Sequence, residues 1–175
     1  MLTFVSAKLR KAQRSAKFVF LLMTEFPLLN LPVHPLRVRR DSAGGCQVYD
    51  RLRGRYVSLT PEEWVRQHFV EYLVQDLGYP VGLIANEVSL KHNGMRRRVD
   101  TLVGDRYGRP LMIVEYKAPS VGITQAVFDQ ICRYNMQLRV RWLVVSNGLQ
   151  HYCCRIDYDS MTYTFLPDVP CYEDL

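Results

Sequence analysis

The sequence predicts a single α/β domain in which a mixed central sheet is flanked by helices, with a β-rich appendage in front of it. A chain of 175 residues is long enough for one domain with a hydrophobic core. Helix signals over residues 60–78 and 125–137 alternate with short apolar runs separated by turn residues. The hydrophobic fraction of 48% and the charged fraction of 23% are ordinary for a soluble globular protein.

Four parts are expected along the chain. Residues 1–22 are interpreted as a dispensable basic extension outside the core, because the composition changes at Met23, the expected true start. The apolar run over residues 18–23 is too short to span a bilayer, and no small-residue cleavage site follows it. The other parts are the β-rich appendage over residues 23–59, the principal domain over residues 60–166 and a tail over residues 167–175.

Charge and cysteine content indicate the kind of partner and the cellular compartment to expect. The net charge is +6, and residues 1–60 carry 11 Lys+Arg against 3 Asp+Glu, so the basic excess lies in the N-terminal third. Basic segments attract phosphate backbones, although a basic tail can also simply aid solubility. Five cysteines without a CxxC pair predict a cytoplasmic protein without a disulfide framework, and no membrane partner is expected.

The appendage and the first helix have clear local signals. Short strands separated by Gly-containing turns are expected at residues 36–40, 47–50 and 56–59, as a small β meander. Thr60 is expected to cap a helix that has Pro61 at its first position, and Glu63 completes a capping box. Gly78 suits the C-terminal end of this helix.

The centre of the domain carries an acidic pair beside a lysine. The apolar runs Thr101–Gly104 and Leu111–Val114 are expected to form a β-hairpin. Asp100 begins one strand and Glu115 ends the other, while Lys117 points the same way as Glu115. Such carboxylates can bind Mg²⁺, and the lysine can orient a water or stabilise phosphate charge. Solvated edge charges are the alternative, but charge that ends an apolar run is costly unless it is paired or metal-bound.

The remaining elements complete a sheet around a second helix. Further strands are expected at residues 83–90, 139–146, 150–155 and 161–165. In the helix predicted over residues 125–137, Gln130 and Tyr134 are four apart and share one face. Taken alone, this pair carries almost no functional information.

These motifs together resemble a nuclease family. Asp100, Glu115 and Lys117 follow the PD-(D/E)xK signature, and about residues 60–155 are similar to the N-terminal nuclease domain of type I restriction enzyme R subunits. Val99 replaces the nominal proline of the signature, which is a loose position. R subunits continue into a helicase motor, whereas this sequence has no Gly-x-x-x-x-Gly-Lys phosphate loop. The resemblance implies a restriction-endonuclease-like sheet.

The resemblance also implies an activity, which is Mg²⁺-dependent hydrolysis of DNA phosphodiesters with Mn²⁺ as a possible substitute. Asp100 and Glu115 would hold the metal ion. Lys117 would position the attacking water or stabilise charge. Gln130 would orient Lys117 or the scissile phosphate, and Tyr134 would contact DNA or order the site.

Other residues and other functions remain open at this point. The resemblance also implies that Glu63 joins the metal site, although its capping role alone explains it fully. Arg97 and Arg98 would meet DNA phosphates or pair with acids such as Glu87. Besides DNA, the partners implied are other restriction-modification or helicase subunits. One alternative is a catalytically inactive nuclease-fold module for DNA binding or assembly. A metal-free RNA-binding protein is a weaker alternative, because no aromatic stacking platform is evident.

Overall fold

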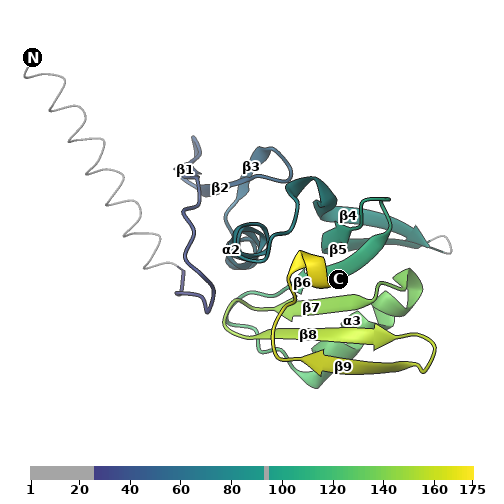
Figure 1. The fold of residues 1–175 in the computed structure, drawn as a ribbon. Coiled ribbons are helices and arrows are strands. Elements are labelled where there is room, and N and C mark those ends of the chain that lie inside the picture. Colours follow the sequence, from purple (N-terminus) through teal and green to yellow (C-terminus); the bar gives the residue numbers. More distant parts are fainter. Residues whose placement is uncertain (1–25, 93–94) are drawn as a thin grey trace, which may run out of the picture.

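The computed structural model describes residues 26–92 and 95–175, and the predicted extension over residues 1–22 lies outside them (Figure 1). A three-stranded sheet contains β1 (Val38–Arg40), β2 (Cys46–Asp50) and β3 (Arg55–Ser58). A six-stranded sheet contains β4 (Ile84–His92), β5 (Met95–Gly104), β6 (Pro110–Tyr116), β7 (Trp142–Ser146), β8 (His151–Asp157) and β9 (Thr162–Leu166). The helices are α2 (Pro61–Gln75) and α3 (Gln125–Leu138), with short 3-10 turns η1 (Val81–Leu83) and η2 (Tyr172–Asp174).

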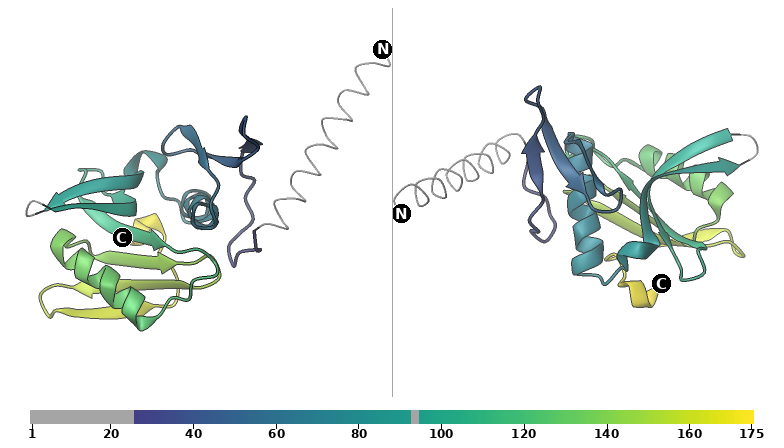
Figure 2. Two further views of the ribbon diagram at one scale, coloured as in Figure 1. Left: turned by 180° about the vertical axis from the view of Figure 1, so that it is seen from behind. Right: turned by 90° about the horizontal axis from the view of Figure 1, so that it is seen from above.

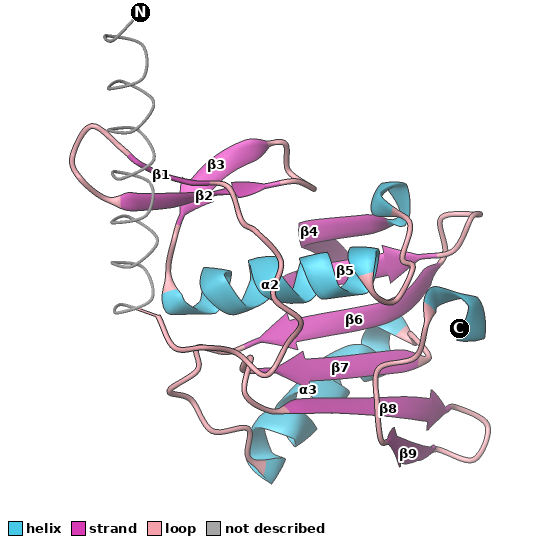
Figure 3. Cartoon of the chain, turned by 60° about the vertical axis from the view of Figure 1, so that its left-hand side comes forward, coloured by secondary structure: helices cyan, strands magenta, loops and turns pink. Residues whose placement is uncertain are grey.

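The large sheet is mixed, which confirms the predicted fold class. Its strand order is β4-β5-β6-β7-β8-β9, with β6 and β7 parallel and every other pair antiparallel. A parallel pair needs a crossover, which α3 supplies. The helices α2 and α3 lie on opposite sides of this sheet (Figure 3).

Side chains of β6 and β7 alternate between the two faces of the sheet, so a separate hydrophobic cluster forms against each helix. Val114 and Val144 belong to the cluster that includes residues of α2, whereas Ile113 and Leu143 belong to the cluster that includes residues of α3. Successive strand residues project from opposite faces, so continuous apolar runs in β6 and β7 fill both cores.

Helix α2 lies between the two sheets and is therefore buried on most sides (Figures 1 and 2). It begins as predicted, with Pro61 in the first turn and the Thr60 hydroxyl accepting from the Glu63 amide at 3.1 Å. Phe69 packs into the core with the large sheet, while Trp64 stacks on Phe26 next to the small sheet. Within the described part of the chain, no helix is long and apolar enough to cross a membrane.

A buried chain of hydrogen bonds ties the small sheet to the large one. The Asp50 carboxylate accepts from the Asn86 amide at 2.9 Å, and Thr101 donates to Asn86 at 2.6 Å. The Tyr116 hydroxyl donates to Thr101 at 3.1 Å. Burial works against the charge of Asp50, but the hydrogen bonds from Arg53 and Asn86 outweigh it and lower the pKa of this carboxyl.

The last residues of the chain, which the sequence predicts as a tail, pack against the domain. Val169 is 7% exposed and belongs to the core cluster on the α2 side of the sheet. The Tyr79 hydroxyl donates to the Pro170 carbonyl at 2.9 Å, and the Tyr172 hydroxyl donates to the Gly104 carbonyl at 3.3 Å. These contacts cover the edge of the core near the start of β4.

His68 is expected to make the stability of this fold sensitive to acid. It is 9% exposed and packs edge-on against Trp64, and burial, helped by the charge of His34, lowers its pKa to about 4. In the unfolded chain His68 becomes protonated as the pH falls through about 6.5, whereas in the folded chain it becomes protonated only near pH 4. We expect the free energy of unfolding to fall by about 3 kcal/mol between pH 7 and pH 4 from this group alone. Denaturant unfolding curves across that pH range measure the loss.

A substitution isolates the contribution of His68. His68→Gln should flatten the pH dependence between pH 7 and pH 4, and His151, whose pKa is also lowered by burial, should account for part of what remains. An unchanged pH profile in this variant would assign the acid sensitivity to other groups.

Candidate functional site

The predicted site residues lie where two neighbouring strands part. The pairing of β5 with β6 reaches only as far as Thr101 and Val114, whereas β5 remains paired with β4 down to Met95. Strand β6 instead continues along β7. The next residues after this last pair are Asp100 and Glu115, and the β4–β5 hairpin diverges from the sheet beyond them (Figure 2). Asp100 therefore lies inside its strand, not at its beginning as the sequence analysis expected.

Both oxygens of the Asp100 carboxylate have fixed partners. Oδ2 accepts from the Tyr116 backbone amide at 2.9 Å, which takes the place of a ladder hydrogen bond at the point where the strands separate. Oδ1 accepts from Nη2 of Arg66, on α2, at 3.1 Å. The carboxylate is thus oriented by the backbone of β6 on one side and by a helix on the other.

Glu115 lies next to Asp100, and Lys117 is close enough to act on Glu115 electrostatically. Burial, and then the negative charge of Asp100, raise the pKa of Glu115 to about 8, while the positive charge of Lys117 opposes this rise. The Lys117 amide donates to the Ser146 carbonyl at 2.9 Å, so the end of β6 is held against β7. The structure places Asp100 and Glu115 side by side, and Lys117 acts on Glu115 through its charge.

Arg66 occupies the centre of an acidic cluster that the sequence analysis did not identify. Its guanidinium donates to Glu63 at 2.9 Å, Glu87 at 2.6 Å, Asp100 at 3.1 Å and Glu62 at 3.3 Å. Its side chain is only 3% exposed. Several carboxylates can share this small volume because a buried cation compensates their charge.

Glu87 has an unusual backbone. Its φ of +58° lies in the left-handed region, which a non-glycine residue in a strand rarely adopts. Its carboxylate is clamped between Arg66 and Arg98, and the Nε of Arg98 lies at 2.6 Å. Of the two roles predicted for Arg98, pairing with an acid such as Glu87 is the one seen. The side chain of Arg97 lies outside the described residues.

The first turn of α2 contributes two acids with different surroundings. The predicted Glu63 is bound by Arg53 at 2.7 Å and by Arg66, which separates it from Asp100. Burial, and then the charge of Asp100, raise the pKa of Glu62, so this half-exposed neighbour senses the site directly. The family resemblance implied the site role of Glu63, with capping as the competing explanation, and the only signal for Glu62 was its place in the same turn.

The two residues predicted on the second helix fall on α3, which spans Gln125–Leu138. The helix begins with the Thr124 hydroxyl accepting from the Val127 amide and ends at Arg139 in a left-handed conformation. The side chains of Gln130 and Tyr134 lie outside the described residues, so their predicted orientation stays a prediction.

The donor set fits a hard divalent cation. Burial, and then the charge of Asp100, raise the pKa of Glu115 to about 8 even though Arg66 is bound to Asp100 and Lys117 opposes the rise, so a divalent cation between the two carboxyl groups would relieve their repulsion. Among the described residues, no group of three or more His, Cys, Asp or Glu side chains is arranged to hold a metal ion. Asp100 and Glu115 would therefore supply the protein ligands, and water would complete the shell, as is usual for Mg²⁺.

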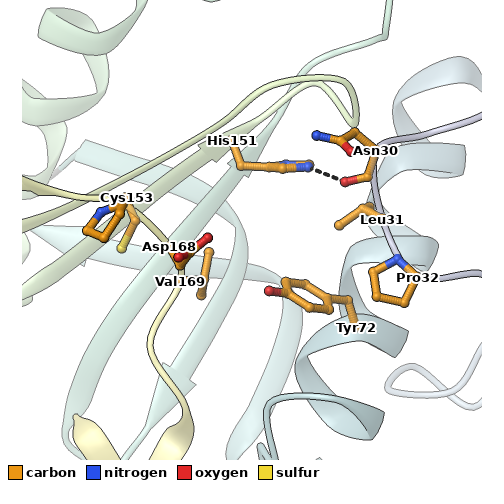
Figure 4. A pocket seen from close by; sticks show the side chains of 9 residues that line it. Asn30, Leu31, Pro32, Tyr72, His151, Cys153, Asp168 and Val169 are labelled. Carbon is orange, nitrogen blue, oxygen red and sulfur yellow. Dashed lines mark hydrogen bonds between the residues drawn. The ribbon is translucent and has the colours of Figure 1, made fainter.

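A separate pocket lies beside the N-terminal strap, the segment over residues 26–37 that precedes β1, and it includes none of these residues (Figure 4). It is lined by Asn30, Tyr72, His151 and residues 167–169, among others. The Nε2 of His151 donates to the Asn30 carbonyl at 2.8 Å, so its Nδ1 accepts from the Ser146 hydroxyl at 2.8 Å. This histidine links the N-terminal strap to β8 through the Asn30 hydrogen bond, at a pocket that does not include the acidic pair.

Comparisons with known proteins point to one family. The family described as the type I restriction enzyme R protein N terminus (HSDR_N) matches residues 61–170. A solved fragment assigned as an HsdR subunit of a type I restriction enzyme from Vibrio vulnificus YJ016 is 20% identical, with a TM-score of 0.49. The match covers 67% of this chain and 24% of that one, so this chain spans about a quarter of its length. No curated protein matches the sequence.

Proposed function

Because the chain belongs to the family of type I restriction enzyme R protein N termini, we propose that it is a Mg²⁺-dependent endonuclease of the PD-(D/E)xK type. Its substrate would be DNA, with Mn²⁺ able to replace Mg²⁺, and its partners would be other subunits of a restriction-modification system. One observation carries the proposal, which is the Asp100–Glu115 carboxyl pair next to Lys117 at the point where β5 leaves β6.

The residues of the site suit phosphodiester hydrolysis. Asp100 and Glu115 would hold the metal ion, which when bound would supply positive charge to the phosphate and acidify a water. A bond forms between the water oxygen and phosphorus, the bond from phosphorus to the departing sugar oxygen breaks, and that oxygen takes up a proton. The Lys117 ammonium would orient the water or donate to a phosphate oxygen as negative charge develops.

A second function is favoured by one specific contact. Arg66 already donates to Asp100 and thus supplies part of the positive charge that a metal ion would bring. A domain in which Arg66 permanently replaces the cation would be an inactive DNA-binding or assembly module. The two functions differ in whether divalent cations bind at Asp100.

Cleavage by the wild-type protein separates these functions. We expect purified protein to cut supercoiled, linear or single-stranded DNA with Mg²⁺ or Mn²⁺ and to be inactive with EDTA, because the carboxyl pair needs a cation to act. We also expect Mg²⁺ to raise the melting temperature of the wild type but not of Asp100→Asn. Salt-sensitive DNA binding with neither cleavage nor a Mg²⁺-induced shift would favour the inactive module.

A further inference from the structure

The three-stranded sheet presents one face that is rich in arginine and tyrosine. Val38, Val48 and Val57 pair across the strands and belong to the apolar cluster of the small sheet. The alternate positions point to the opposite face. That outer face carries Arg37, Arg39, Gln47, Tyr49, Tyr56 and Ser58.

The arginines on this face are held in place by the tyrosines. The guanidinium of Arg39 lies 3.8 Å from the centre of the Tyr56 ring, and that of Arg37 lies 5.6 Å from the Tyr49 ring. The two tyrosines contact each other edge-on with 5.3 Å between their centres. Gln47 accepts from the Nε of Arg39 at 2.9 Å, which fixes the direction of the guanidinium fork. Stacking on a ring orders a guanidinium without using its N–H groups.

The donors of these arginines remain available. Arg37 and Arg39 are exposed, and within the described residues their terminal guanidinium nitrogens donate to no protein atom. The outer strand positions include no acid, and Glu71, which shares a pocket with Arg37 and Tyr49, is already paired with Arg51 at 3.1 Å. An ordered, uncompensated pair of guanidinium groups suits phosphate oxygens.

We propose that this outer face, the Arg–Tyr face, is a second DNA-binding surface that contacts the phosphate backbone of double-stranded DNA. The tyrosine rings are covered by arginine and by each other, so backbone contact fits this face better than stacking of unpaired bases. The face lies outside residues 61–170, where the family matches, so the site at Asp100 does not include it. The choice of DNA as the nucleic acid rests on the proposed function.

Binding in EDTA tests the surface independently of cleavage. Fluorescence anisotropy with a labelled DNA duplex is measured for the wild type, Arg37→Gln/Arg39→Gln and the control Arg106→Gln/Arg109→Gln. The control removes the same two charges from a second exposed group in which two arginines lie over a tyrosine, Tyr107. We expect the first variant to bind about tenfold more weakly and to lose about 2 units from the slope of log K against log salt, with the control near wild type.

A neutral substitution then tests the geometry apart from the charge. Tyr56→Leu keeps the net charge but removes the ring beneath Arg39, and we expect about threefold weaker binding. Equal losses in both arginine double variants, or no duplex binding by the wild type, would overturn the proposal. Arginine-dependent binding that is tighter for single-stranded RNA or equal for polyglutamate would overturn the assignment to DNA. If the wild type binds as expected but never cleaves, the surface stands and the proposed nuclease function falls.

Discussion

Asp100→Asn and Lys117→Met are each expected to lower DNA cleavage by about a thousandfold or more, because each removes one part of a site that works as a unit. Asp100→Asn would remove one negative charge from the metal site, whereas Lys117→Met would leave both carboxyl groups in place and remove only the ammonium. Single-turnover cleavage of supercoiled DNA in Mg²⁺ measures the loss. Duplex affinity in EDTA should stay within about threefold of wild type, because backbone contacts are distributed over many residues.

A matched control separates this effect from a general loss of charge. Arg155 is an exposed cation on β8, and Arg155→Gln should leave the cleavage rate within about twofold of wild type. Lys117→Arg retains the charge but changes its shape, so it should recover part of the activity lost in Lys117→Met. Cleavage within tenfold of wild type in Asp100→Asn would place the metal site elsewhere in the chain.

Arg66→Met is expected to have the largest effect on stability, a loss of about 3–5 kcal/mol of unfolding free energy in EDTA. Glu63, Glu87 and Asp100 would lose their shared cation while remaining partly or fully buried, and an uncompensated buried charge is strongly destabilising. Because the same carboxylates would then be free, Mg²⁺ should raise the melting temperature of this variant by more than it raises that of the wild type.

Arg98→Gln provides the comparison for Arg66. Arg98 also pairs with Glu87, but the Arg98 side chain is 66% exposed, so its removal should lower the free energy of unfolding by no more than about 1 kcal/mol. A metal-binding measurement that does not depend on activity, such as Mn²⁺ titration followed by electron paramagnetic resonance, should show tighter binding to Arg66→Met than to the wild type. Weaker Mn²⁺ binding in that variant would mean that Arg66 builds the metal site and does not compete for it.

The sequence predicted those features of the fold that are decided by residues near one another. The start of α2 was correct because Thr60 and Pro61 settle a helix terminus within one turn. The start of β5 was placed too late, since three arginines follow its first residue and this segment forms a strand by pairing with β4 as far as Met95. The packing of Val169 also depends on distant elements, so no local pattern could reveal it.

The candidate site was predictable in part for the same reason. Asp100, Glu115 and Lys117 follow a motif with fixed spacing, and the structure places Asp100 beside Glu115, with Lys117 acting on Glu115 through its charge. The central position of Arg66 arises because α2, β4 and β5 converge in space, and one arginine within a helix has no distinguishing pattern. Glu87 could not be singled out either, because its left-handed backbone occurs where the pairing of β4 with β5 is interrupted between Asn86 and Val88, which no local pattern reveals.

The hydrogen-bond chain that begins at Asp50 bears on how this protein unfolds. The family matches residues 61–170, but the buried Asn86 amide in that segment donates to a carboxylate that belongs to β2. Arg53, next to β3, binds Glu63 of α2 in the same way. The start of the family match at residue 61 therefore does not separate two independently unfolding units. The small sheet and the domain built on the large sheet should open and close as one unit in native-state hydrogen exchange.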